Sequence, residues 1–270
     1  MRKNLPVALT IAGSDSGGGA GIQADLKTFA ALGVHSTSAI TCITAQNPKR
    51  VLAVEACSPK IVREQIEAVF EELPPAAVKT GMLYSAEIIR TVAKLFRNSK
   101  LKTRNPKLIV DPVMVSTSGA PLLKSSALQA LQKELLPLAT LVTPNLDEAE
   151  ILAGKKLRSP QDLRDAARII HRRFGCAVLV KGGHLKNSRE AIDILFDGKT
   201  EWLLTAPFVR GVSTHGTGCT YSAAITGYLA LNYRLPEAVK RAKLFISQAI
   251  VQSQHAGNHS VLNCLCRLKP

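Results

Sequence analysis

One stretch organises the predicted fold: Val212-Ser213-Thr214-His215-Gly216-Thr217-Gly218-Cys219-Thr220, followed by an apolar run over 221–231. Its two glycines, two positions apart at the start of a predicted helix, leave the backbone amides of residues Gly216, Thr217, Gly218 and Cys219 free to face one point. The first amides of a helix have no intrahelical partner and carry the positive end of the helix dipole. The stretch therefore predicts a backbone-built site for an anion such as phosphate.

Cys219 falls in the first turn of this predicted helix. A helix N-terminus can lower the pKa of a thiol from about 8.5 toward roughly 3.5–7.5. We therefore expect a thiolate that acts as a base or nucleophile at neutral pH. These nine residues leave an alternative open, which is a glycine-rich turn into a helix with a buried, unreactive cysteine.

Length and composition favour one α/β domain over residues 1–270. A chain of 270 residues, 46% of them hydrophobic, is near the upper size for a single core. No apolar run reaches the ~18 residues that a membrane span requires, and residues 1–6 lack the pattern of a secretory signal. We expect a cytoplasmic protein with no membrane partner. Its six cysteines include no C-x-x-C pair and are expected to be reduced thiols.

The charge of the chain is strongly basic. Lys and Arg number 35 against 20 Asp and Glu, which gives a net charge of +15. Six basic residues and no acidic one lie between Lys94 and Lys107. Such a stretch can bind nucleic acid, but Phe96 is its only aromatic residue and no nucleic-acid motif is present, so we favour a solvated helix end and connection. We expect no nucleic-acid partner, and a basic surface that suits anionic substrates such as nucleotides.

Strand-like and helix-like segments alternate along the whole chain. The predicted strands cover residues 5–12, 34–45, 51–57, 76–79, 108–110, 138–142 and 176–180, with a hairpin over 191–196 and 202–205. The predicted helices cover 22–32, 59–73, 85–96, 125–136, 160–174 and 235–252, and a further helix begins at the glycines of the 212–220 stretch and continues through the apolar run 221–231. This alternation predicts a largely parallel sheet with helices on both faces.

A second glycine-rich segment follows the first predicted strand: Gly13-Ser14-Asp15-Ser16-Gly17-Gly18-Gly19-Ala20-Gly21. It can bring bare backbone close to a ligand. It does not match G-x-G-x-x-G, and the chain has no G-x-x-x-x-G-K-[ST] phosphate loop, so neither dinucleotide nor Walker-type binding is favoured. Asp25, in the first turn of the next helix, offsets the helix dipole with or without a chemical role.

Polar residues end several predicted strands, at the edge where open α/β sheets collect ligands. Gln46, Asp111 and Lys181 are the clearest cases, and Lys181 beside Gly182-Gly183 is suited to reach a phosphate. Asn145 and Glu148, three residues apart after another strand, match a capping box and need no ligand to explain them. Gln46 at a strand end is also explained by a turn.

The C-terminal segment after about residue 255 carries His255-x-x-x-His259 and Cys264-x-Cys266. These are metal-binding residue types, but their spacing is poor for zinc. We expect a frayed terminus.

The order of several motifs resembles the ribokinase-like small-molecule kinases, and more narrowly the hydroxymethylpyrimidine and phosphomethylpyrimidine kinases of thiamine synthesis. The motifs are residues 12–25, Thr44-Ala45-Gln46-Asn47, Lys79-Thr80-Gly81-Met82-Leu83, Asp111-Pro112-Val113-Met114, residues 143–149, Val180-Lys181-Gly182-Gly183-His184 and residues 215–220. The resemblance spans about residues 7–250. It implies a three-layer αβα sandwich with a largely parallel central sheet.

The resemblance also implies an activity, which is phosphoryl transfer from ATP to 4-amino-5-hydroxymethyl-2-methylpyrimidine and then to its monophosphate. In the family, protein groups mainly position the reactants and stabilise charge. The implied catalytic set is Gly216, Thr217, Gly218 and Cys219, with the amides as an anion hole and the Cys219 thiolate as base.

The remaining site residues follow from the same resemblance. Lys181 and Asn145 would bind ATP, while Asp111 and Glu148 would organise Mg²⁺, partly through water. Gln46, Asp25 and Met82 would line the pyrimidine pocket, since an amide can both donate to and accept from an aminopyrimidine. A monovalent cation and a homodimer are further features that the family suggests.

Three other interpretations remain open. The first is a pyridoxal kinase, because some relatives with the Gly-Thr-Gly-Cys arrangement phosphorylate pyridoxal; Gln46 favours the aminopyrimidine. The second is a pyrimidine-binding sensor without turnover, against which the presence of Asp111, Glu148, Lys181 and Cys219 argues. The third is nucleic-acid binding by the basic surface. The segment after Asn258 and the high charge have no counterpart that the resemblance explains.

Overall fold

The computed structural model describes residues 4–97, 105–114, 125–183, 185, 190–209 and 215–266. Within these ranges a nine-stranded sheet has the order β3-β2-β1-β4-β5-β6-β7-β8-β9. Its strands are β1 (Val7–Asp15), β2 (His35–Asn47), β3 (Arg50–Ala56), β4 (Ala77–Thr80), β5 (Lys107–Val110), β6 (Leu141–Val142), β7 (Ala177–Gly182), β8 (Glu190–Phe196) and β9 (Glu201–Pro207). The six adjacent strands β2, β1, β4, β5, β6 and β7 pair in parallel. Strand β3 at one end and strands β8 and β9 at the other pair antiparallel.

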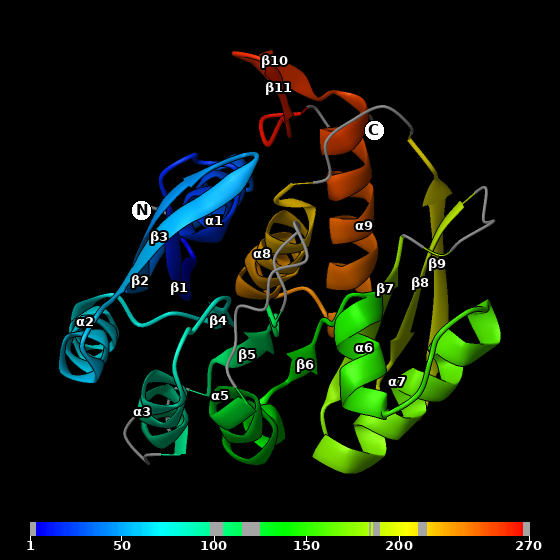
Figure 1. Ribbon diagram of the computed structural model, residues 1–270, viewed down its shortest axis with the longest axis horizontal. Helices are drawn as coiled ribbons and strands as arrows, with labels where there is room; N and C mark the ends of the chain where they lie inside the picture. Colours follow the sequence, from blue (N-terminus) through cyan, green and yellow to red (C-terminus); the bar gives the residue numbers. More distant parts are fainter. Residues whose placement is uncertain are drawn as a thin grey trace.

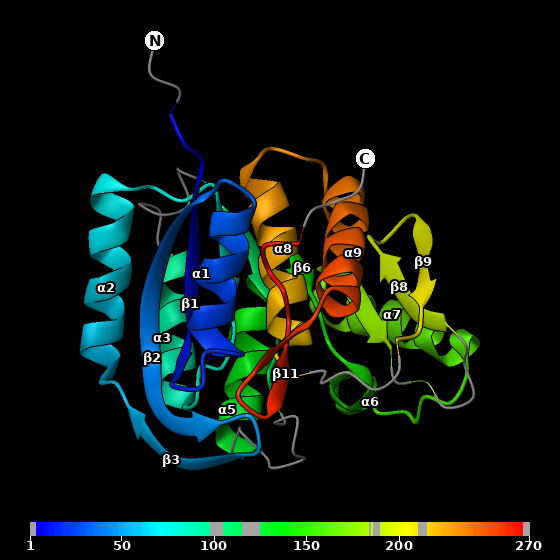
Figure 2. The same cartoon turned by 90° about the horizontal axis from the view of Figure 1, so that it is seen from above.

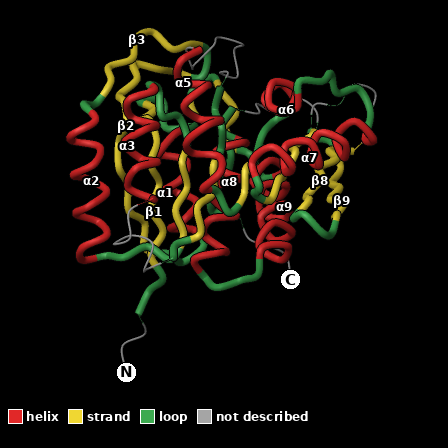
Figure 3. The backbone as a smooth tube through the Cα atoms, turned by 90° about the horizontal axis from the view of Figure 1, so that it is seen from below, coloured by secondary structure: helices red, strands yellow, loops and turns green. Residues whose placement is uncertain are grey.

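Helices cover both faces of this sheet. One face carries α2 (Pro59–Glu72), α3 (Ala86–Arg97), α5 (Ser125–Ala130), α6 (Leu146–Ala153) and α7 (Pro160–Phe174), and the other carries α1 (Gly21–Ala31), α8 (Thr217–Ala230) and α9 (Leu235–Val251). Figure 1 places α1, α8 and α9 above the sheet, and Figure 3 shows the helices in red overlapping the strands in yellow when the molecule is seen from below. The predicted αβα sandwich with a largely parallel sheet is confirmed.

The sheet is buried because its strands alternate between two cores. Leu9 and Ile11 of β1 pack with the α2 and α3 side, whereas Ala8 packs with Phe29 of α1 on the other side. Near-continuous apolar runs are expected where a parallel strand is covered on both faces. Figure 2 shows the long strand β2 curving with β3 along one edge of the molecule.

Helix starts follow the local signals in the sequence. Ser58 Oγ accepts a hydrogen bond from the Ile61 amide at 3.3 Å, with Pro59 in the first turn. Ser159 and Asp162 form a reciprocal capping box at the start of α7, and Gly175 ends that helix in the left-handed conformation. These predicted boundaries are confirmed.

Two predicted elements differ from the structure. The predicted helix over 125–136 ends as α5 at Ala130 and continues as a π-helical turn (Leu131–Leu135) and a 3₁₀ turn (Leu136–Leu138). Pro137 lacks an amide hydrogen and disfavours a regular helix there. The strand predicted over 138–142 is accordingly shortened to Leu141–Val142.

The C-terminal segment is not frayed within the described residues, so that prediction is wrong. Strands β10 (Gln254–Ala256) and β11 (His259–Val261) form a hairpin, seen beside the end of α9 in Figure 1. Cys264 and Cys266 are each 9% exposed and pack in the core of α8 and α9. The described residues contain no metal-binding group of three or more His, Cys, Asp or Glu side chains. Sequence alone did not reveal the surface that this segment covers.

Parts of two sequence predictions lie outside the described residues: 212–214 of the glycine-rich stretch, and His184 after Lys181. In the basic stretch, Lys94 and Arg97 occupy the last turn of α3 as expected, but 98–104 are not described. No helix in the described ranges has the length and apolarity to cross a membrane.

An ion pair is fully buried between α1 and β4. Lys79 Nζ lies 2.5 Å from Asp25 Oδ1, and both side chains have no solvent exposure. Thr10 Oγ1 donates to the other Asp25 oxygen at 2.6 Å. Removing one partner of such a pair leaves an uncompensated buried charge.

We predict that Asp25→Ala lowers the free energy of unfolding by about 3–5 kcal/mol. Urea denaturation measures this change. The control is Glu64→Ala, which removes one partner of an exposed pair with Lys60 at 3.9 Å and should leave the unfolding curve unchanged. Equal, small effects of both substitutions would contradict a structural role for the buried pair.

Candidate active site

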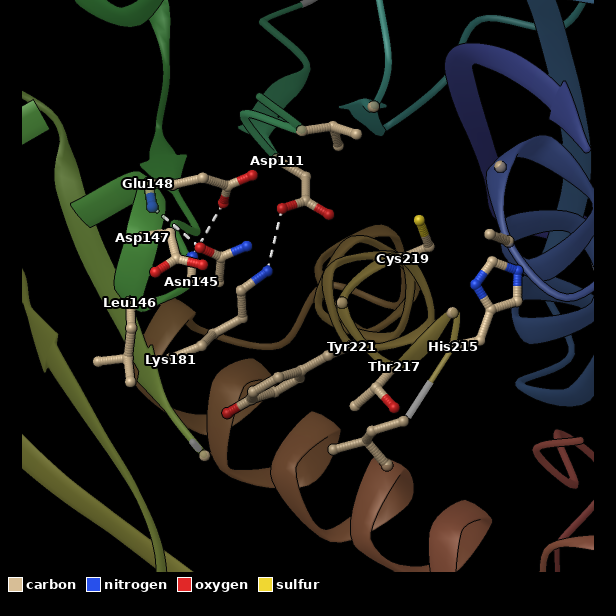
Figure 4. A pocket seen from close by; sticks show the side chains of 18 of the residues that line it. Asp111, Asn145, Leu146, Asp147, Glu148, Lys181, His215, Thr217, Cys219 and Tyr221 are labelled. Atoms are coloured by element: carbon tan, nitrogen blue, oxygen red, sulfur yellow. Dashed lines mark hydrogen bonds and ion pairs between the residues drawn. The ribbon is translucent and has the colours of Figure 1, made fainter. Parts of the chain in front are cut away.

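A cavity of about 1000 Å³ lies at the carboxyl ends of the parallel strands. Its wall includes polar side chains from the ends of four strands, Gln46, Lys79, Asp111 and Lys181, together with the start of α8. Open α/β sheets bind ligands at this edge. Figure 4 shows how the labelled side chains converge there.

Helix α8 begins at Thr217, directly after Gly216 in the left-handed conformation with φ of 80°. A Cβ at Gly216 would collide with the carbonyl oxygen of Gly19, so only glycine fits there. The Thr220 amide donates to the Gly216 oxygen at 2.9 Å, which closes the first turn of the helix. The preceding amides lack an intrahelical acceptor, so the helix start that the sequence predicts is present and faces the cavity.

A lysine and an aspartate stand directly opposite these amides. Lys181 Nζ lies 3.0 Å from Asp111 Oδ1, and Figure 4 shows the lysine side chain reaching toward the carboxylate. A Cβ at Gly218 would lie 3.3 Å from Lys181 Nζ and 4.0 Å from Asp111 Oδ2. The backbone of α8 therefore approaches the ion pair closely, and glycine at 218 keeps that space open.

Asp111 is held from two further sides. Thr143 Oγ1 donates to its Oδ1 at 3.2 Å, and Ser222 Oγ of α8 lies 3.0 Å from its Oδ2. The carboxylate is 3% exposed. Ser222 was not among the predicted site residues, because a serine inside an apolar helix gives no signal in the sequence.

Glu148 combines the two roles that the sequence left open. It forms the predicted capping box, in which Asn145 Oδ1 accepts from the Glu148 amide and Glu148 Oε2 accepts from the Asn145 amide, both at 2.9 Å. Its Oε1 accepts from the Met114 amide at 3.0 Å. Asn145 and Glu148 both line the cavity, so the cap also fixes a carboxylate in the cavity wall.

The charge around Glu148 is unbalanced. Burial raises the pKa of Glu148 from 4.5 to about 7; the Lys181 ammonium opposes this rise and the Asp111 carboxylate adds to it. Two buried carboxylates thus share one nearby ammonium. Such a donor set fits Mg²⁺, which proteins bind through one or two carboxylates together with water and substrate phosphates.

The Cys219 thiol lies at the start of α8, half-buried in the cavity wall. Burial raises the pKa of this thiol to about 11; Lys79 and the Gly21 amide lower it, whereas Asp25 and Asp111 raise it. The expected thiolate at neutral pH is therefore wrong for this structure. Loss of water and two nearby carboxylates outweigh the helix N-terminus.

Gln46 and Met82 line the same cavity on the side of β2 and β4, as the sequence predicted. Gln46 Oε1 lies 3.2 Å from Thr44 Oγ1, whose hydroxyl proton is directed at the Ser14 backbone carbonyl at 2.9 Å. The Gln46 side-chain amide carries both a donor and an acceptor, which suits a heteroaromatic ligand.

Asp25 does not line the cavity, in contrast to the prediction. It has no solvent exposure and is enclosed by Lys79 and Thr10. The residue that lines the cavity is its partner Lys79. The sequence placed Asp25 in the first turn of α1 but did not show that this face of the helix packs against the sheet.

Asp15, Lys79 and His215 are among the cavity residues that the sequence analysis did not assign to the site. Asp15 and Lys79 carry the same signal as Asp111, since each is a charged residue at the carboxyl end of an apolar strand. His215 precedes Gly216 and has no comparable signal. Figure 4 shows it near Cys219 and Thr217.

Residues 15–263 match the family model described as phosphomethylpyrimidine kinase. The chain is 51% identical over 245 residues to a hydroxymethylpyrimidine/phosphomethylpyrimidine kinase of Rhizobium meliloti, covering 90% of each protein. It is 46% identical over 257 residues to the thiamine biosynthesis bifunctional protein ThiED of Geobacter sulfurreducens, covering 94% of this chain and 51% of that protein. The chain thus spans about half the length of that bifunctional relative.

Solved structures of two kinds are similar to the chain. A pyridoxal kinase of Bacillus subtilis in an ADP complex has a TM-score of 0.88 at 38% identity, covering 97% of this chain and 98% of that one. A phosphomethylpyrimidine kinase of Clostridium difficile has a TM-score of 0.79 at 48% identity, covering 92% and 100%. Sequence identity is higher with the second, whereas the backbone superposition is closer with the first.

The raised pKa of Glu148 predicts a pH-dependent stability in the absence of metal. The folded state binds this proton more tightly than the unfolded chain, so the stabilisation is complete below about pH 4.5 and is lost as the pH rises through about 7. In Glu148→Gln this loss is absent. We therefore expect the melting temperature of wild type relative to Glu148→Gln to fall between pH 5 and pH 8.

Differential scanning calorimetry with EDTA present measures this difference. Glu134→Gln, at a partly exposed glutamate paired with Arg90, is the control for the substitution itself. A constant difference between wild type and Glu148→Gln across this pH range would contradict the raised pKa.

Proposed function

Because the chain belongs to the phosphomethylpyrimidine kinase family, we propose that it transfers a phosphoryl group from ATP to 4-amino-5-hydroxymethyl-2-methylpyrimidine and then to the resulting monophosphate. One observation carries the proposal: the start of α8 faces the Lys181–Asp111 pair across Gly218. An anion site, a cation and a carboxylate thus meet in one cavity. A phosphoryl group held there has donors on two sides.

Stabilisation of the transferring phosphoryl group falls to the backbone and to Lys181. Phosphoryl transfer requires mainly positioning and charge neutralisation from the protein. The amides of Gly216, Thr217, Gly218 and Cys219 would surround the equatorial oxygens, where loss of one well-placed donor costs about 3 kcal/mol of the barrier. Lys181 would contact ATP phosphates from the opposite side, released from part of its pairing with Asp111.

Asp111 and Glu148 are the residues that would hold Mg²⁺. When bound, the ion neutralises charge that develops between the phosphates. The Asn145 cap keeps Glu148 in the cavity wall, and Thr143 and Ser222 orient Asp111. These contacts position both carboxylates before any ligand binds.

Cys219 would remove the proton of the attacking hydroxyl group. Its raised pKa means that the thiolate is a minor form at neutral pH. Once formed, that thiolate is a strong base. Activity through this route should therefore increase with pH up to about 11.

Gln46 and Met82 would hold the pyrimidine. The Gln46 nitrogen is a donor for a ring nitrogen, and Met82 offers an apolar contact to the ring. Lys79 closes the cavity floor nearby. A small molecule is the partner that this cavity suits; Mg²⁺, a homodimer and a cytoplasmic location belong to the same proposal.

A pyridoxal kinase is the second candidate, favoured by the TM-score of 0.88 with the Bacillus subtilis enzyme. Two features oppose it: sequence identity is higher with the pyrimidine kinases, and the Gln46 amide suits an aminopyrimidine. ADP release with each compound separates the two.

The test measures ADP release at pH 7.5 with Mg²⁺, ATP and either pyrimidine or pyridoxal. We expect turnover of the pyrimidine with kcat/KM above that for pyridoxal. Cys219→Ala should lower kcat by about 10²- to 10⁴-fold, as for a lost general base. The control is Cys57→Ala, at another half-buried cysteine outside the cavity.

The pH profile isolates the role of the thiol. In wild type, kcat/KM for the pyrimidine should rise about tenfold per pH unit from pH 6 to pH 9, because the free-enzyme pKa lies near 11. Cys219→Ala should lose this slope. Faster turnover of pyridoxal would reverse the choice of substrate, and a flat wild-type profile would remove the base role from Cys219.

A further inference from the structure

The Asp15 carboxylate gathers the amides of the glycine-rich loop 16–20. Its Oδ1 accepts from the Gly17 amide at 2.8 Å, and its Oδ2 accepts from the amides of Gly19 at 3.1 Å and Ala20 at 2.8 Å. Asp15 is 3% exposed. Loop 16–20, whose sequence suggested a ligand site, therefore encloses the Asp15 carboxylate.

The same carboxylate contacts the residue before the α8 anion site. His215 Nε2 lies 3.4 Å from Asp15 Oδ2. Burial raises the pKa of Asp15, but hydrogen bonds from His215 and from the Ala20 and Gly17 amides outweigh this and hold it below its usual value. The carboxylate is thus charged at neutral pH and attracts both the loop and the histidine.

The histidine ring also packs on the loop. A Cβ at Gly19 would lie 2.7 Å from His215 Cδ2. The next residue, Gly216, is in contact with the Gly19 carbonyl. The loop therefore fixes the position at which α8 begins.

The loop also contacts strand β2 near Gln46, where the proposed pyrimidine site lies. Ser16 Oγ donates to the backbone carbonyl oxygen of Gln46 and accepts from the backbone N–H of Gln46, both at 2.8 Å. Thr44 Oγ1 donates to the Ser14 oxygen at 2.9 Å. One short loop thus touches both Gln46 and the start of the anion site.

We propose that Asp15 and His215 are positioning residues that hold the anion-site amides of α8 in register with the substrate site at Gln46. The inference rests on the proposed function, because transfer requires the acceptor oxygen and the phosphoryl group to meet within about 3–3.5 Å. In this role the two side chains act without contact to the reacting atoms. They act through loop 16–20 and Gly216.

The experiment compares His215→Ala with His215→Gln, whose amide nitrogen still donates to Asp15. We expect His215→Ala to lower kcat by about 10- to 100-fold with the KM for pyrimidine nearly unchanged. Calorimetry should show that Mg²⁺ and AMP-PNP bind at least several-fold more weakly. His215→Gln should restore most of both losses.

His171→Ala is the matched control. His171 is also half-buried and packs on a glycine, since a Cβ at Gly198 would lie 2.6 Å from its ring, but it lies outside this cavity. It should change neither kcat nor nucleotide affinity. If His215→Ala does not fold, His215→Asn replaces it, because the shorter amide cannot reach Asp15.

The outcomes separate this inference from the proposed function. Wild type that releases ADP while His215→Ala keeps full kcat and full AMP-PNP affinity overturns the positioning role alone. Loss in His215→Ala without rescue by His215→Gln also overturns it, since contact with Asp15 is then irrelevant. Wild type without turnover refutes the kinase proposal, and AMP-PNP affinity across the same variants still decides the positioning role.

Discussion

The structure depends on the close contact between two glycine-rich segments. Gly216 adopts a left-handed conformation and lies against the carbonyl of Gly19, so helix α8 can begin only where the first loop allows it. That start turns unpaired helix amides toward the carboxyl edge of the sheet. The ends of the strands place Lys181 and Asp111 at the same point, so unpaired amides, an ammonium and a carboxylate meet in the cavity wall.

The pairing of buried charged side chains determines the chemistry of this cavity. Asp25 neutralises Lys79 in the cavity floor, and Asp111 pairs with Lys181. Within the described part of the chain, Glu148 accepts hydrogen bonds from backbone amides only, and its burial raises its pKa to about 7 in spite of them. The surplus of buried negative charge favours a divalent cation. Burial first, and then the Asp25 and Asp111 carboxylates, raise the pKa of the Cys219 thiol and keep it protonated at neutral pH. Binding of a metal and a phosphate therefore changes the balance on which the base depends.

Much of the fold is predictable from local sequence because its signals are local. Ser58 with Pro59 and Ser159 with Asp162 satisfy helix amides within one turn, and Asp111 and Lys181 follow directly after apolar strands. What failed depends on distant residues. The pKa of Cys219 is set by burial and by carboxylates far away in the chain, Asp25 is turned from the cavity by packing against Lys79, and the segment after residue 252 finds its place only because α8 and α9 offer an apolar surface. No local pattern contains these long-range contacts.

The most direct test of the account is a crystal structure with Mg²⁺, ADP, aluminium fluoride and the hydroxymethylpyrimidine, which mimics the phosphoryl group in transfer. The account predicts the fluoride group within hydrogen-bond distance of the Gly218 and Cys219 amides and of Lys181 Nζ, with the pyrimidine against Gln46. A fluoride group bound elsewhere in the cavity, with the start of α8 unliganded, would contradict it.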